Sequence, residues 1–195
     1  MAQSQQARAT RQDIERELAR RDFAFFCEYV HDRPLYPHQL AWAEEMQRPA
    51  SKTLIVAPPG SYKSTICSYF VEWCIGRDPD FTVLHLMNTA AQAQRQVMSI
   101  SDTIEFNPKY RQVFPGIVPD KARGWSHENL FVRRKDSNNP YATVYGTGID
   151  GPYQGVHVDL IIIDDPTDQQ DVYSLATMTQ QRQRVKGVML DRLNP

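Results

Sequence analysis

The stretch from Thr53 to Ile66, TLIVAPPGSYKSTI, constrains the fold of this chain more than any other. It opens on four apolar residues, Leu54 to Ala57, a run typical of a short strand buried on both faces. The sequence Pro58-Pro59-Gly60-Ser61 interrupts this pattern, and Lys63-Ser64-Thr65 then opens a segment predicted to be helical from Ile66 to Ile75. A strand, a tight loop and a helix that begins with Lys-Ser is the layout of a phosphate-binding loop.

This loop departs from the consensus G-x-x-x-x-G-K-[ST] of the Walker A motif at both glycine positions. Ala57 stands at the first position and Tyr62 at the second. Tyr62 matters more, because the residue before the lysine must let the backbone approach a phosphate. The same residues are therefore also compatible with a buried strand and an ordinary helix start, with Lys63 exposed.

A second strong signal is the run VDLIIIDDP from Val158 to Pro166. Its four consecutive apolar residues predict a central strand, and Asp164 and Asp165 emerge at the carboxyl end, where open α/β sheets place ligands. In a Walker B motif of this kind Asp164 would hold Mg²⁺, and Asp165 would orient the water that attacks the terminal phosphate.

The two motifs together predict a site for ATP and Mg²⁺. Lys63 would bridge the outer phosphates, the Ser64 hydroxyl would ligate Mg²⁺, and backbone N–H groups would cradle the anion. The Gln39 amide can pair with adenine and Tyr36 can stack on its ring, although Gln39 is equally compatible with a plain helix start. The predicted nucleotide contacts are Tyr36, Gln39, Pro59, Gly60, Ser61, Tyr62, Lys63, Ser64 and Thr65.

Strands and helices alternate along the chain, which predicts an α/β fold with a mostly parallel sheet flanked by helices. A helical N-terminal segment carries an apolar stripe made of Ile14, Leu18, Phe25 and Tyr29. We expect residues 1–9 to be a frayed tail and residues 10–195 to form one domain. Further predicted elements are a helix to Gln47, a strand Phe81–Met87, a helix Ala90–Glu105, strands at Leu130–Val132 and Ala142–Tyr145, and helical structure over Asp168–Leu193.

The segment Gly146 to Gly151 matches G-x-G-x-x-G letter for letter. We reject a dinucleotide-binding interpretation, because Pro152 and a second strand follow where that fold requires a helix. The expected structure is a glycine loop that leads into the next strand.

The composition excludes several classes of protein. A net charge of -1 gives no global attraction to nucleic acid. The three cysteines form no C-x-x-C pair, the histidines show no ligand spacing, and the chain has neither a signal peptide nor an apolar run long enough for a membrane. We therefore expect a soluble intracellular protein. A local basic group is either a solvated face or a DNA contact: Lys121, Arg123, Arg133, Arg134 and Lys135.

Several segments together resemble the ATPase domain of the large terminase subunit, the motor that packages DNA in tailed bacteriophages. They are Asp22–Phe26, Tyr36–Gln39, the loop APPGSYKST, Leu84–Gln96, Gly124-Trp125 and Gly155–Pro166. The resemblance implies a P-loop NTPase fold of the additional-strand (ASCE) type, with Lys63, Ser64 and Thr65 serving nucleotide and magnesium. It also implies that Asp164 serves the metal, Asp165 catalysis and Gln39 adenine.

The same resemblance implies partners and a location. They are double-stranded DNA, the portal of the procapsid, the small terminase subunit and further copies of the chain in a ring, all in the host cytoplasm and transiently at the portal vertex, with no membrane. Relatives often carry an arginine just after the glycine that precedes the Asp-Asp strand, where this chain has Val156 and His157. An arginine finger that acts on a neighbouring subunit is therefore expected among Arg123, Arg133 and Arg134.

The family would continue beyond Pro195 into a coupling strand and a nuclease domain. We accordingly expect a truncated ATPase domain whose residues carry no nuclease activity. Two alternatives stay open. One is a helicase-like nucleic-acid translocase, which shares the glutamine, the loop and the acidic strand. The other is a nucleotide-binding assembly module with little hydrolysis, which Tyr62 favours.

Overall fold

A computed structural model of the chain describes residues 2–49, 52–136, 138–153 and 155–166, together with positions 179, 183, 186 and 187. The helical structure predicted over Asp168–Leu193 lies outside these residues except at those four positions. Among the described residues, no helix is both long enough and apolar enough to cross a membrane.

The described residues form both helices and strands. In chain order they are α1 (Ala2–Arg21), α2 (Phe23–His31), α3 (Pro37–Met46), α4 (Lys63–Arg77), β1 (Val83–Met87), α5 (Ala90–Phe106), α6 (Pro108–Val113), β2 (Asn129–Leu130), β3 (Val144–Gly148) and β4 (Leu160–Asp164). The strands form one sheet in the order β2-β3-β1-β4, in which β1 runs parallel to β3 and β4 while β2 is antiparallel to β3. The predicted α/β class with a mostly parallel sheet is confirmed.

The register of the parallel strands brings their carboxyl ends to one edge of the sheet. Met87, the last residue of β1, pairs with Gly148 of β3 and with Asp164 of β4. The acidic end of β4 therefore lies at the edge where α/β sheets bind their ligands.

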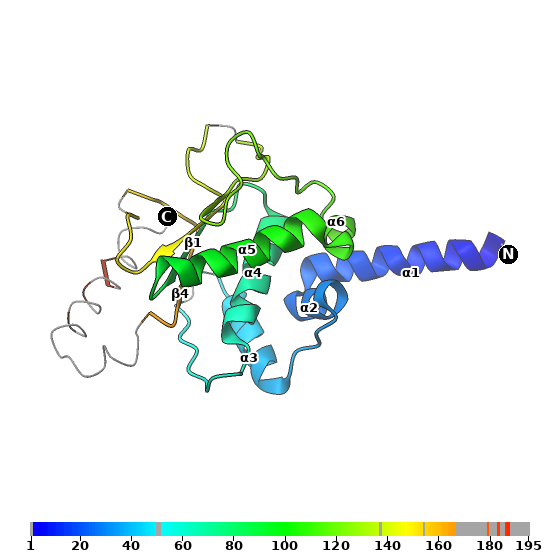
Figure 1. Ribbon diagram of the computed structural model, residues 1–195. Coiled ribbons are helices and arrows are strands. Elements are labelled where there is room, and N and C mark those ends of the chain that lie inside the picture. Colours follow the sequence, from blue (N-terminus) through cyan, green and yellow to red (C-terminus); the bar gives the residue numbers. More distant parts are fainter. Residues whose placement is uncertain are drawn as a thin grey trace.

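Helices α4 and α5 lie together over the sheet (Figure 1). The close approach of α5 depends on two glycines of β3. A Cβ atom on Gly146 would lie 2.3 Å from Cγ2 of Val97, and one on Gly148 would lie 3.0 Å from the backbone N of Ala90. Both glycines lie inside β3, so the predicted glycine loop is wrong for these two residues. A turn at Ile149 follows and not a helix, in agreement with the rejection of a dinucleotide motif.

The N-terminal segment is divided into two helices at Asp22. The side chain of Asp22 accepts a hydrogen bond from the backbone N of Phe25 at 2.7 Å, which caps α2 and ends α1. The predicted stripe assumed one continuous helix and is wrong for Ile14 and Leu18, which are 56% and 46% exposed, whereas Phe25 and Tyr29 are partly buried against the core. The buried residues are instead Ala19, Phe23, Phe26, Cys27 and Val30. Helix α1 begins at Ala2, where we expected a frayed tail, and extends away from the sheet (Figure 1).

The predicted buried strand over Leu54–Ala57 is wrong. These residues form no strand, and the side chains of Leu54 and Val56 are 87% and 86% exposed. The physical reason is the lack of a neighbour, because a strand needs a ladder partner and β4 pairs only with β1 among the described residues. The segment predicted to bind phosphate is therefore positioned by α4 and not by the sheet.

Candidate functional site

Two residues before α4 have a left-handed backbone conformation. Gly60 has φ 81°, and Tyr62, the N-cap of α4, has φ 64° and ψ 27°. The Ser61 N–H donates to the carbonyl of Pro58 at 3.3 Å and closes a turn between them. A left-handed conformation costs a residue with a Cβ about 1–2 kcal/mol, which glycine avoids. Tyr62 therefore adopts the backbone conformation for which the consensus has glycine.

The side chain of Lys63 folds back over this loop. Its Nζ donates to the carbonyl of Ala57 at 2.8 Å and lies 3.5 Å from the carbonyl of Pro58. An ammonium group is thereby held at the start of a helix of 15 residues, where unpaired N–H groups and the helix dipole already favour an anion.

The next residue, Ser64, connects α4 to the end of β4. Its hydroxyl lies close enough to the Asp164 carboxylate, which is only 6% exposed, to lower the pKa of that carboxylate. Burial raises the pKa of Asp164. The Ser64 hydroxyl acts to lower this pKa, the charge of Asp165 raises it further, and Lys63 acts to lower it. The Oδ2 atom of Asp164 is buried and has no hydrogen-bond partner among the described residues. Such an orphaned acceptor is costly, so the site favours a ligand that satisfies it.

A hydroxyl and a buried carboxylate oxygen fit Mg²⁺. This ion takes oxygen ligands and commonly keeps several waters, with one or two protein groups completing its shell. Among the described residues, no group of three or more His, Cys, Asp or Glu side chains could hold a metal. The fit therefore rests on Ser64 and Asp164 together with the phosphates of a ligand.

Asp165 follows β4 directly and is exposed, with φ 41°. A positive φ on a residue with a side chain is a strained conformation that is common at functional sites. The sulfur of Cys67, one turn into α4, is close enough to these groups that Asp164 and Asp165 contribute to its raised pKa. Burial is the larger cause and raises that pKa to about 12, so the thiol is neutral and unreactive.

Gln39 reaches the loop from α3. Its side chain is 1% exposed, its Oε1 accepts from the N–H of Tyr36 at 3.0 Å, and its Nε2 donates to the carbonyl of Ser61 at 3.1 Å. The amide thus ties the start of α3 to the phosphate loop and keeps one N–H and one lone pair for another partner. Tyr36 is 60% exposed, so its ring can stack on a base. The adenine contacts stay a prediction.

The three candidate arginine fingers do not meet the loop within this chain. Arg123 and Arg134 donate to backbone carbonyls, at 2.7 Å to Asn139 and 2.6 Å to Tyr141. Both partners precede β3, at the edge of the sheet opposite to Asp164. Arg133 is exposed, and its guanidinium has no partner among the described residues.

The sequence did not lead us to predict two residues near the loop. Arg33 lies with its guanidinium carbon 4.2 Å from the centre of the Tyr62 ring, and no spacing rule connects a residue before Pro34 to this loop. Cys67 could have been found, because it follows Lys63 by one helical turn.

The local geometry is the basis for assigning a function. The chain matches no protein-family model and no curated protein.

Proposed function

We propose that this chain binds ATP with Mg²⁺ at the start of α4 and hydrolyses it, as the motor domain of a viral DNA-packaging terminase. The observation that carries the nucleotide site is the contact between Ser64 and the buried Asp164, beside Lys63. A lysine, a hydroxyl and an unsatisfied carboxylate oxygen at a helix N-terminus form a set that matches a triphosphate with a divalent cation.

Lys63 and the first turn of α4 would bind the phosphates. The N–H groups of Lys63, Ser64 and Thr65 belong to the first turn, which has no intrahelical acceptors for them. The Lys63 ammonium now donates to the neutral carbonyl of Ala57, and a phosphate oxygen is the stronger acceptor. We therefore expect Lys63 to exchange this carbonyl for phosphate.

Ser64 and Asp164 would hold Mg²⁺, which when bound neutralises charge on the phosphate oxygens. Asp165 would orient the attacking water, because it is an exposed carboxylate next to the predicted metal ligand. Gln39 and Tyr36 would recognise adenine, and the bond from Gln39 to the Ser61 carbonyl would couple that recognition to the loop.

The motor assignment goes further than the nucleotide site and depends on the sequence resemblance. In this proposal the chain acts in a ring of identical subunits, with double-stranded DNA, the procapsid portal and the small terminase subunit as partners in the host cytoplasm. The exposed Arg133 is the best placed of the three arginines to act on a neighbouring subunit, because Arg123 and Arg134 already bind carbonyls of their own chain.

A second candidate is a nucleotide-binding module that hydrolyses little ATP. Two observations favour it: Tyr62 occupies a glycine position, and the exposed Leu54 and Val56 belong to a segment that forms no strand. A loop without support from a sheet can bind phosphate through α4 and still position water poorly.

Equilibrium binding and turnover of ATP test both candidates. We expect Lys63→Ala to raise the Kd for Mg²⁺-ATP at least about tenfold, since it removes a charge-assisted contact. The control is Lys135→Ala, which removes an exposed lysine outside the loop and should leave the Kd unchanged. A wild-type Kd in Lys63→Ala would refute the nucleotide site. Tight binding without turnover in the wild-type protein would favour the binding module.

A further inference from the structure

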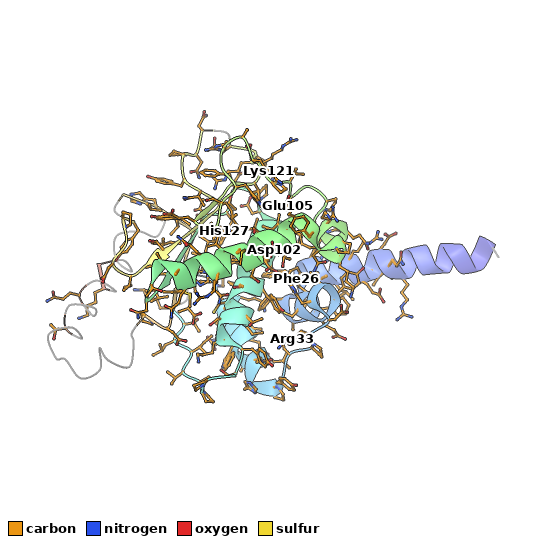
Figure 2. All side chains as sticks on the ribbon, viewed as in Figure 1. Phe26, Arg33, Asp102, Glu105, Lys121 and His127 are labelled. Atoms are coloured by element: carbon orange, nitrogen blue, oxygen red, sulfur yellow. The ribbon has the colours of Figure 1, made fainter. Side chains whose placement is uncertain are left out.

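Arg33 connects the end of α2 to the phosphate loop. Its guanidinium carbon lies 4.2 Å from the centre of the Tyr62 ring, within the range of a cation–π contact, at the lower end of α4 in Figure 2. The same side chain lies near Tyr69, one of the partly buried residues of α4, and its charge acts to lower the pKa of Tyr69 against the larger effect of burial. One arginine thus contacts both the residue that precedes Lys63 and the body of the helix that begins there.

The position of Arg33 is fixed by its own backbone. Asp32 ends α2 in a left-handed conformation with φ 53°, and the Arg33 N–H donates to the carbonyl of Cys27 at 3.2 Å. Pro34 follows and restricts the chain further. Beneath the arginine, the ring of Tyr69 stacks on His31 with centroids 3.6 Å apart, and His31 Nε2 lies 2.7 Å from Oε2 of the buried Glu72. The side chains next to the guanidinium are therefore closely packed against one another.

Tyr62 needs such support, because it holds a left-handed conformation that its side chain disfavours. Its ring is 48% exposed, so burial in the core does not supply the support. Lys63 follows it directly, and a change in the backbone of Tyr62 would redirect the first N–H groups of α4 and the Lys63 side chain.

We propose that Arg33 is a positioning residue, which holds Tyr62 in its left-handed conformation and so keeps the phosphate loop in its binding geometry. This role extends the proposed function. It rests on the proposed function only for the identity of the ligand, ATP. Arg33 acts on the loop through the Tyr62 ring, whereas the residues before the loop form no strand that would hold it.

Hydrogen exchange of the loop amides, residues 60–66, measures this role without any nucleotide. Arg33→Ala and Tyr62→Leu should each speed exchange there about three- to tenfold, and the double variant should go no further than either single one. Arg33→Lys should restore part of the protection, and Tyr62→Phe should keep nearly all of it, because it retains the ring face.

Arg77→Ala is a matched control. Arg77 makes the same kind of contact at the far end of α4, with its guanidinium carbon 4.4 Å from the centre of the Trp73 ring. The variant Arg77→Ala should leave the hydrogen exchange of the loop amides unchanged. Equal effects of Arg33→Ala and Arg77→Ala on the loop, or an unchanged loop in Arg33→Ala, would overturn the proposal.

The Kd and kcat for Mg²⁺-ATP separate this proposal from the proposed function. Arg33→Ala should raise the Kd about three- to tenfold and leave kcat at saturation within about twofold, since the residue orders the loop and touches no reacting atom. A fall in kcat at an unchanged Kd contradicts a positioning role. If the wild-type chain binds no ATP, the proposed function fails, and the exchange of the loop still decides whether Arg33 positions it.

Discussion

The hydroxyl of Ser64 lies beside the carboxylate of Asp164 and acts to lower its pKa, so the first turn of α4 meets the carboxyl end of β4. The contact forms although residues 52–57 take no part in the sheet. Its geometry is set by the packing of α4, whose Ile66 and Phe70 are buried in the core that also includes Ile162 of β4. The two halves of the site therefore meet because a helix docks on the sheet.

Replacing Asp164 by Asn should separate metal binding from folding. Because burial raises the pKa of Asp164, folding disfavours its charged form relative to the unfolded chain, and the amide should leave the unfolding temperature equal or higher. The variant should at the same time lose the tightening of ATP binding by Mg²⁺. Thermal unfolding measures the first effect, and the Kd for ATP with and without Mg²⁺ measures the second. A variant that keeps its Mg²⁺ dependence would show that the metal is bound elsewhere.

Asp165→Asn should slow the hydrolysis of ATP and leave the binding of Mg²⁺-ATP nearly unchanged. We expect the Kd for Mg²⁺-ATP to stay within about twofold of the wild type, whereas kcat falls by about a hundredfold or more, as for loss of a group that acts on the attacking water. Single-turnover hydrolysis measures the rate, and equilibrium binding measures the Kd. Near-normal turnover would move the role to another carboxylate such as Asp168, which lies outside the described residues.

The parts of the site that were predictable depend on local signals. Lys63 opens a helix where the sequence changes from Pro-Pro-Gly to helix-forming residues, and Asp164 ends an apolar run. Parallel pairing then brings the end of β4 to the ligand edge of the sheet. These inferences need only the periodicity and the order of the elements.

The parts that failed depend on partners distant in the sequence. Leu54 and Val56 have strand-forming side chains, but a strand also needs a neighbour, and the described residues provide none. The Asp22 cap overrides the apolar stripe of the N-terminal segment by starting a second helix. The contact of Arg33 with Tyr62 depends on the direction in which the chain leaves α2, which no spacing encodes.

His85 should make the stability depend on pH. It is 0% exposed in β1, neither ring nitrogen has a hydrogen-bond partner within the described part of the chain, and burial lowers its pKa to about 4. Below its ordinary pKa of about 6.5 the unfolded chain binds a proton that the folded chain rejects, so stability falls as the pH is lowered from about 6.5 towards 4. The loss from this one group should be about 2 kcal/mol between about pH 7 and 5.

Denaturant unfolding at both pH values, for the wild type and His85→Leu, isolates this effect. The leucine variant lacks the titrating ring and should show a drop smaller by that amount. Glu72, a buried acid whose pKa is raised mainly by burial, is present in both proteins, so its contribution of opposite sign cancels. Parallel pH profiles in the two proteins would show that His85 is protonated without cost.

Leu54→Ser and Val56→Ser should be nearly neutral, because these side chains are 87% and 86% exposed. We expect each to change the free energy of unfolding by less than about 0.5 kcal/mol, as for surface substitutions. Leu84→Ala, at a position that is 0% exposed in β1, is the control and should cost about 2–5 kcal/mol. ATP binding should also persist, since Lys63 is held by the carbonyl of Ala57 and not by an apolar side chain. A loss near that of the control would mean that this segment forms a buried strand after all, with a partner that supplies its ladder.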